Sequence, residues 1–151
     1  MAKTNALITK FKIEINGVGN FGSDIVSVGG LSLGEEGEIE VPERNRIALV
    51  SDGIKKYEPL AIRFRLVSGL VTFDFFLDLW NNRASKNSDI VIIETLRDGI
   101  TEVFRWVYTD CECKKLGSAE DLEIGTIRVK EFDTIFAINN VGLQKAGQTT
   151  T

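Results

Sequence analysis

The residues that most often carry out chemistry in proteins are sparse in this sequence. Its 151 residues include no histidine, two cysteines and one methionine. Without histidine, the commonest general base near neutral pH and the commonest metal ligand are both missing. A Ser-His-Asp or Cys-His catalytic arrangement or an HExxH zinc site therefore cannot be built. We expect no enzyme and no cofactor, although carboxylate-pair or lysine chemistry stays open in principle.

The two cysteines, Cys111 and Cys113, stand two residues apart in a segment expected to be extended. Both thiols should then share one face of the strand, where a disulfide between them is geometrically unfavourable. Half of a metal site is conceivable, but no second Cys or His pair completes it. We expect two free thiols packed as small apolar groups.

Carboxylates are concentrated in the segment 35–43, EEGEIEVPE, which holds five glutamates in nine residues. Glu36, Glu38 and Glu40 alternate onto one face of an extended segment. In a monomer such a face is simply solvated. The alternative is the wall of a passage, because a negative wall repels polyanions within about 8 Å at physiological salt and stops them from sticking.

The segment 72–83, TFDFFLDLWNNR, is the one stretch with helical periodicity. Its apolar residues follow the i, i+3, i+4, i+7 spacing of one buried face: Phe73, Phe76, Leu77 and Trp80. Thr72 is expected to cap the first turn. Phe75 and Leu79 widen the apolar stripe beyond one contact surface, so the helix should also meet a second surface, which could be another subunit.

The rest of the chain shows the period of two that is typical of strands. Extended segments are predicted at 10–16, 25–33, 35–43, 57–66, 89–96, 101–108 and 124–138. Asp98 and Gly99 form a hairpin signal. The segment 42–46 should interrupt pairing, and 51–55 supplies turn residues.

These patterns predict a mainly β protein: an antiparallel β-sandwich or barrel with one flanking α-helix. The chain should form a single domain, 1–151, with a globular core at 10–140, an extended hairpin arm at 35–56 and a loose tail at 142–151. The net charge of −4 does not indicate a nucleic-acid binder. No apolar run approaches 18 residues and the first residues lack a signal-peptide core, so we expect no membrane segment and a cytosol-like compartment.

The order of these elements resembles the tail tube proteins of contractile-tailed bacteriophages, which are related to the tube proteins of contractile injection systems. The resemblance spans roughly residues 10–140 and depends on marks that occur in this order: Tyr57, Pro59 and Leu60, then Trp80, then Asp98 and Gly99, then Arg105 and Trp106. One departure is the Cys111-Glu112-Cys113 segment, which replaces the family's usual apolar pair. Subunit contacts near that point are therefore left open.

The resemblance implies homohexameric rings that stack into a hollow tube, in which strands of every subunit join one ring-wide inner β-barrel. It implies a structural virion protein of the tail, assembled in the host cytoplasm with sheath, tape measure, baseplate and tail terminator proteins. DNA would pass through the tube into the host without sequence-specific binding. Glu36, Glu38 and Glu40 would face the lumen. Contacts between subunits would come from Arg44, Arg46, Ile47, Lys55, Phe75 and Leu79.

Two other hypotheses stay open. An Hcp-like tube protein of a contractile secretion system would have the same architecture but pass effectors instead of DNA. A monomeric ligand-binding β-barrel belongs to a different class.

Overall fold

The computed structural model describes residues 10–19, 21, 24–43, 46–66, 70–119, 121, 124–125 and 129–145, and for residues 36–43 and 46–55 it describes the backbone alone. The elements in this part of the chain are β1 (Lys10–Ile15), β2 (Ile25–Gly29), β3 (Glu35–Glu43), β4 (Arg46–Lys56), β5 (Leu60–Arg65), α1 (Val71–Asn81), β6 (Ser88–Thr95), β7 (Glu102–Ser118), β8 (Glu131–Ala137) and β9 (Asn140–Lys145). The predicted mainly β, antiparallel fold with one helix is confirmed. No helix in this part of the chain is long and apolar enough to cross a membrane.

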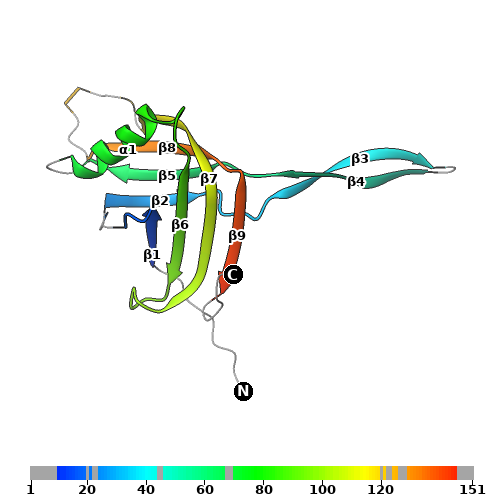
Figure 1. Ribbon diagram of the computed structural model, residues 1–151, viewed down its shortest axis with the longest axis horizontal. Coiled ribbons are helices and arrows are strands. Elements are labelled where there is room, and N and C mark those ends of the chain that lie inside the picture. Colours follow the sequence, from blue (N-terminus) through cyan, green and yellow to red (C-terminus); the bar gives the residue numbers. More distant parts are fainter. Residues whose placement is uncertain are drawn as a thin grey trace, which may run out of the picture.

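The body of the molecule is built around the 17-residue strand β7, which belongs to two layers. Its first half pairs with β6 and β9, and β6 pairs with β1; we call these strands the β6 layer. Its second half pairs with β8, followed by β5 and β2; we call these strands the β5 layer. Asp110, with φ of 54°, lies between the two halves. The strands of the two layers cross one another in Figure 1, as in an orthogonal sandwich.

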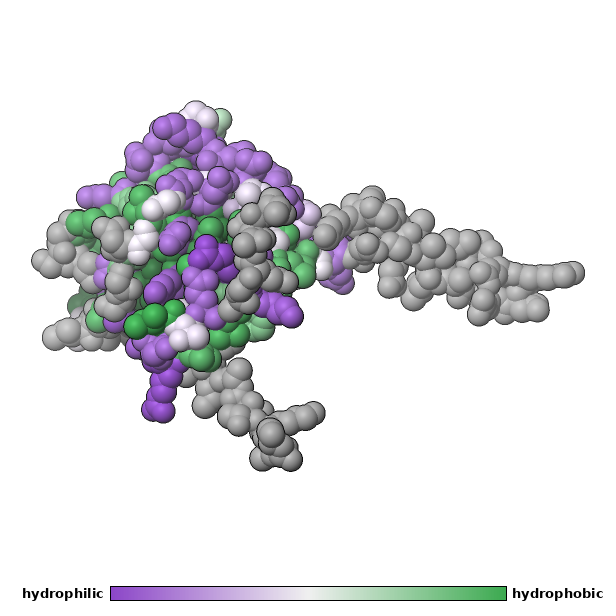
Figure 2. Space-filling model, turned by 60° about the horizontal axis from the view of Figure 1, so that its bottom comes forward, coloured by the Kyte–Doolittle hydropathy of each residue, from purple (hydrophilic) through white to green (hydrophobic). Residues whose placement is uncertain are grey.

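The core fills the space between the layers. Its most deeply buried apolar side chains are Ile13, Ile15, Leu60, Ile62, Phe64, Phe76, Ile90, Ile92, Tyr108, Cys111, Cys113 and Phe136. Strand β5 alternates as predicted, with Leu60, Ile62 and Phe64 buried and the residues between them exposed. Helix α1 closes one side of the core, because the Phe76 ring stacks on the Phe64 ring at 4.5 Å between centroids. The side of the body seen in Figure 2 mixes hydrophilic and hydrophobic residues, with hydrophilic residues gathered along its upper margin.

The helix begins differently from the prediction. It spans Val71–Asn81 and not 72–83, and the residue before it, Leu70, has φ of 54° and forms no side-chain cap. Thr72 is buried, and its hydroxyl donates to the Asp24 carboxylate at 2.6 Å. The predicted cap is therefore wrong, because a tertiary partner takes the hydroxyl that the first turn was expected to use.

The predicted turn at 51–55 is also wrong. Strand β4 runs without a break from Arg46 to Lys56, and even Pro42 has a register partner in it, Ile47. The turn-type residues fall at a register shift, where Glu36 pairs with Lys55 and Glu38 with Ser51. A bulge accommodates residues that would otherwise end a strand.

Two predictions near the end of the chain also need correction. Gly142 to Lys145, expected in a loose tail, belong to β9, which pairs with β7. The long strand predicted at 124–138 begins only at Glu131, because Ile124 and Gly125 form a turn. The backbone hydrogen bonds between β9 and β7 order Gly142 to Lys145, although few of their side chains are apolar.

The aromatic stack between β5 and α1 gives a first test. Replacing Phe64 by alanine should lower the free energy of unfolding by about 3–5 kcal/mol, since the fully buried ring leaves a cavity. Phe11 is 37% exposed, so its replacement by alanine should cost under about 1 kcal/mol. Urea unfolding of both variants measures the difference, and equal losses would contradict the assignment of the core.

The β6–β7 turn gives a second test. The Asp98 carboxylate accepts hydrogen bonds from the Thr101 hydroxyl and from the backbone amides of Thr101 and Ile100. These bonds, the Thr101 hydroxyl first, lower the pKa of Asp98 from 3.8 to about 2. The stabilisation is therefore complete above about pH 4 and is lost as the pH falls to about 2.

We expect the urea midpoint of the wild-type protein to fall more steeply over this pH window than that of Asp98→Asn. Thr101→Ala, which removes the largest contribution, should behave more like Asp98→Asn than like the wild type. Parallel pH profiles for all three proteins would show that the turn makes no such contribution.

Candidate functional site: the bare face of the β5 layer and the arm beside it

The β5 layer is covered on one face only. Along β5, Leu60, Ile62 and Phe64 enter the core, whereas Ala61, Arg63 and Arg65 are exposed. No described strand or helix covers this second face, which we call the bare face. The layer can therefore form a wall with a protein body behind it and open space in front.

Small and charged residues make up most of the bare face. The small residues, placed by their register with β5 and β8, are Ser27, Gly29, Ala61, Gly117 and Ala137. A shallow hollow of about 250 Å³ lies on the β2 side of this face. It is lined by Arg63, Asp133 and three of the small residues, and it also touches Val28, Ile62 and Ile135. The bare face is therefore nearly flat, and its charged side chains project beyond its small residues.

Pairs of opposite charge span neighbouring positions on this face. Arg63 and Asp133 are opposite each other in the β5–β8 register and form two parallel hydrogen bonds, Nε to Oδ1 at 2.8 Å and Nη2 to Oδ2 at 3.3 Å. Lys114 Nζ lies 3.0 Å from Glu112 Oε2. Such exposed pairs contribute at most about 1 kcal/mol each, so their main effect is to neutralise the surface.

A β-bulge adds charge to the bare face. The register of β7 with β8 shifts between Cys113, which is buried, and Lys115, which pairs with Ile135. The ion pair with Glu112 holds Lys114 on the bare face, so both lysines emerge on the same side. Among the described residues, the face carries four cations, Arg63, Arg65, Lys114 and Lys115, and three carboxylates, Glu112, Glu131 and Asp133.

The β5 layer also has two open edges. Among the described residues, no strand pairs with the outer edge of β2, and none pairs with the second half of β7 on the edge away from β8. Open edges of this kind are templates for pairing with another chain. The layer is thus ready to continue into the sheets of neighbouring molecules on both sides.

A two-stranded arm, β3 paired with β4, projects from the body (Figure 1). Nine residues in β3, at about 3.3 Å each, give it a length of roughly 30 Å. Strands β3 and β4 pair with each other, and neither pairs with another strand among the described residues. An arm of this length can reach a second molecule.

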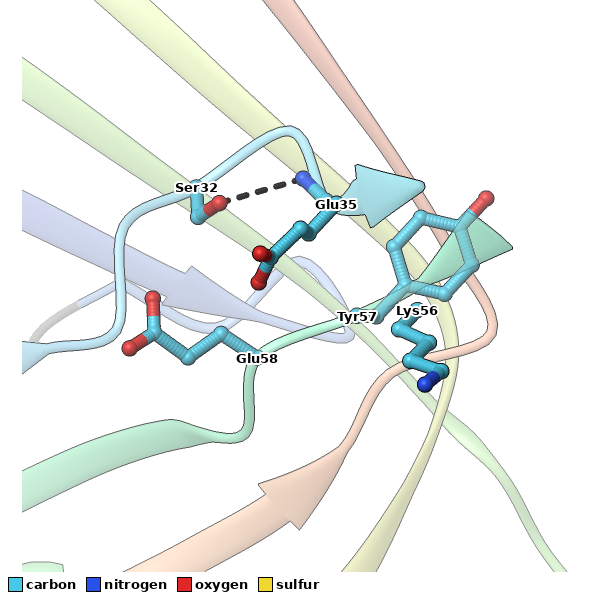
Figure 3. Close-up of a pocket in the computed structure, with 6 residues that line it drawn as sticks. Ser32, Glu35, Lys56, Tyr57 and Glu58 are labelled. Carbon is cyan, nitrogen blue, oxygen red and sulfur yellow. Dashed lines mark hydrogen bonds between the residues drawn. The ribbon is translucent and has the colours of Figure 1, made fainter. Parts of the chain in front are cut away.

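The root of the arm is held in a fixed direction by close packing. A Cβ on Gly34, whose φ is 107°, would lie 3.0 Å from the Lys56 carbonyl oxygen and 3.2 Å from the Tyr57 ring. Ser32 Oγ accepts a hydrogen bond from the Gly34 amide at 3.1 Å. Figure 3 shows the Glu35 carboxylate on the same side of the root as Glu58, bordering a polar pocket of about 210 Å³, with the Lys56 amine pointing away.

The two cysteine thiols and the Tyr108 side chain are buried in the core. Both cysteines are free and buried, which confirms their predicted role as packed thiols. Burial, with Asp89 and Asp110 nearby, raises the pKa of Cys111 to about 12, and burial raises the pKa of Tyr108 to about 12 as well. Within the described ranges no three His, Cys, Asp or Glu residues cluster as a metal site.

The residues predicted from the sequence to contact other subunits or the lumen fall into two groups. Glu36, Glu38 and Glu40 lie in β3, while Arg46, Ile47 and Lys55 lie in β4, and Arg44 is outside the described residues. The register places Glu36 opposite Lys55 and Glu43 opposite Arg46. These lumen and contact roles stay predictions.

The other two predicted contact residues, Phe75 and Leu79, are half-buried on α1 and pack against the core. The Phe75 ring meets the Phe21 ring edge-on at 5.2 Å. At least part of the wide apolar stripe is thus used inside the molecule.

Of the bare face, the sequence showed only the partly basic face of β5. Arg63 and Asp133 are 70 residues apart, and only the β5–β8 register brings them together. The one available signal was the alternation of Arg63 and Arg65 with buried residues, which marks a strand with one basic face.

No protein-family model matches the chain, and no curated protein matches it. Solved structures do match it over nearly its whole length. A chain of the sheath–tube complex of PVC, an extracellular contractile injection system in its extended state, is 17% identical, with a TM-score of 0.73 over 94% of this chain and 93% of that one. A chain of the tube-terminating cap of the anti-feeding prophage AFP is 14% identical, with a TM-score of 0.75 over 97% and 95%. Hcp1 from Flavobacterium johnsoniae is 7% identical, with a TM-score of 0.53 over 90% and 95%.

At these identities the likeness concerns the fold. It confirms what the order of elements in the sequence implied: this chain has the fold of the tube proteins of contractile injection systems.

Proposed function

We propose that this protein is the subunit of the inner tube of a contractile injection apparatus, with a structural and not a catalytic role. The observation that carries the proposal is a four-stranded layer with cover on one face, an open edge on each side and an arm beside it. The tube-protein fold supports it.

The geometry favours one way of building the tube. If β2 of one copy pairs with β7 of the next, the β5 layers form a closed barrel and no open edge remains. Helix α1 and the β6 layer are too bulky for the inside of a narrow barrel, so the bare face looks into the bore. Six four-stranded copies, with strands about 4.8 Å apart and tilted about 40°, would enclose a barrel roughly 50 Å across between backbones.

Helix α1 and the β6 layer then lie outside the barrel. The arm, about 30 Å long, would reach a neighbouring copy in the same ring or the next one. Sheath and tube-terminating cap are partners that the similar assemblies contain. Baseplate and tape measure proteins complete the set of partners that we propose.

Two kinds of cargo suit such a tube. In a phage tail, where the protein would be a virion component assembled in the host cytoplasm, hexameric rings would conduct DNA. Glu36, Glu38 and Glu40 are our sequence-based candidates for repelling it. In a secretion or extracellular injection system the same rings would conduct proteins, and the likeness to PVC, AFP and Hcp supports this second use equally.

Electron microscopy of the purified protein, concentrated alone or with its sheath protein, tests the proposal. We expect hollow cylinders, with six-fold symmetry in end-on views. Rings without stacking would favour the Hcp-like arrangement. A protein that stays monomeric at high concentration would contradict the proposal and favour a monomeric ligand-binding barrel.

The root of the arm can be tested separately with Gly34→Val. The new side chain meets the Lys56 backbone and the Tyr57 ring at a φ of 107°, so we expect a stability loss of about 1–3 kcal/mol and an arm that leaves the body in another direction. The variant should fold, as measured by circular dichroism, but should not form tubes.

Gly142→Ala is the matched control, since nothing lies within 4 Å of its added Cβ, and it should assemble like the wild type. Normal tubes from Gly34→Val would show that the direction of the arm is unimportant for assembly.

A further inference from the structure

Four polar residues with exposed side chains meet at the corner where β7 passes from one layer into the other. They are Asn16, Asp89, Asp110 and Asn139, and we call them the corner group. They come from separate parts of the chain: the turn after β1, the start of β6, the bend of β7 and the link between β8 and β9. Their side chains are exposed and add little apolar burial, so what they contribute is hydrogen bonds.

The backbone at this corner is irregular on both edges of β7. On one edge, β7 places two residues, Thr109 and Asp110, opposite Asp89 alone. Asp110 has φ of 54°, a left-handed conformation that is unfavourable for a residue with a side chain. On the other edge β8 ends at Ala137 and β9 begins at Asn140, so a second chain segment turns the same corner (Figure 1). A strained conformation persists only where neighbouring groups hold it.

The corner group holds the bend from both edges. The Asp110 backbone amide donates to the Asp89 carboxylate at 3.2 Å, and the Asn139 side-chain amide donates to the Asp110 carbonyl oxygen at 2.7 Å. Asn16 positions Asp89 in turn, since the Asp89 backbone amide donates to Asn16 Oδ1 at 2.9 Å and the Asn16 backbone amide donates to the Asp89 carbonyl oxygen at 2.8 Å. Both backbone polar groups of Asp110 are therefore bonded to side chains from other elements.

The bend sets the direction in which β7 continues. Its second half starts directly after Asp110 and carries one of the two open edges of the β5 layer. In the proposed ring this edge pairs with β2 of the next copy, so the inference depends on the proposed function. A ring of six needs a turn of about 60° from copy to copy and a ring of seven about 51°, so a change of about 10° at the corner would alter the number of copies.

We infer that the corner group is a clamp that fixes the angle between the two layers and, through that angle, the number of copies in a ring. A single exposed hydrogen bond contributes little to the stability of a fold. Small energies are sufficient, however, to select between backbone directions that differ by a few degrees. The clamp therefore acts on assembly more than on folding.

Thiol labelling tests the clamp in the dilute, unassembled protein. Cys111 directly follows the bend and is 1% exposed, so it reacts with iodoacetamide only when the corner opens. Asp89→Ala with Asn139→Ala removes both side-chain contacts to Asp110. We expect Cys111 of this double variant to be labelled roughly tenfold faster than in the wild type, or more, as located by tandem mass spectrometry. Buried Cys113 is the internal reference.

Two further variants isolate the hydrogen bonds. Asp89→Asn keeps an oxygen that can accept from the Asp110 amide, so it should behave like the wild type although the charge is lost. Asn140→Ala is the matched control for Asn139→Ala, because Asn140 is exposed, adjacent in the chain and without a side-chain hydrogen bond in the described part of the protein.

Electron microscopy then tests the number of copies. End-on views of the wild type, Asp89→Asn and Asn140→Ala should show one and the same symmetry. The double variant should fold, as measured by circular dichroism, but should give several symmetries or open arcs. If it does not fold, Asn139→Ala alone, which removes a single bond, replaces it in both measurements.

The inference is overturned if the double variant labels Cys111 at the wild-type rate, or if its tubes keep the single symmetry of the wild type. It is also overturned if Asn140→Ala has the same effect as the double variant. Failure of the wild-type protein to form tubes is a different result, which counts against the proposed function. The labelling rates then still decide whether the corner group holds the bend.

Discussion

One strand, β7, pairs in both layers of the molecule, and the placement of the other strands follows from this. A strand can add its backbone hydrogen bonds to two layers only if it bends between them, and the positive φ of Asp110 lies where the bend is needed. Cys111 and Cys113 still reach the core after the bend, which keeps the second half of β7 in the β5 layer with one face inward. The kinked course of β8 into β9 follows β7 through the same corner.

This arrangement makes the two faces of the β5 layer unequal. The core, α1 and the β6 layer all lie on one side, so the aromatic stack of Phe76 on Phe64 stabilises the layer from behind. The other face needs no apolar residues for stability and can be chosen for its charge. A layer built in this way suits a wall, since its stability and its surface chemistry are set by different residues.

The same separation lets the described residues of the bare face carry a nearly balanced set of charges although the chain has a net charge of −4. Net charge is a property of the chain, whereas the field in a bore depends on the residues that line it. A bulge between Cys113 and Lys115 adds a second adjacent lysine to the bare face without disturbing the core. The acidic residues of β3 lie on the arm.

The class of fold, the β5 alternation, the Asp98–Gly99 hairpin, the bounds of β3 and the buried free thiols could be predicted from the sequence, because each of these depends on local periodicity or on residue size. It also carried the order of elements that identifies the tube-protein fold. The start of α1, the unbroken strand β4, the pairing of β9 and the bare face were decided by the tertiary structure. In each case the deciding partner is distant in the chain or across a register: Asp24 for Thr72, β7 for β9 and Asp133 for Arg63. Only the folded chain brings such partners together, so neither periodicity nor spacing could have shown them.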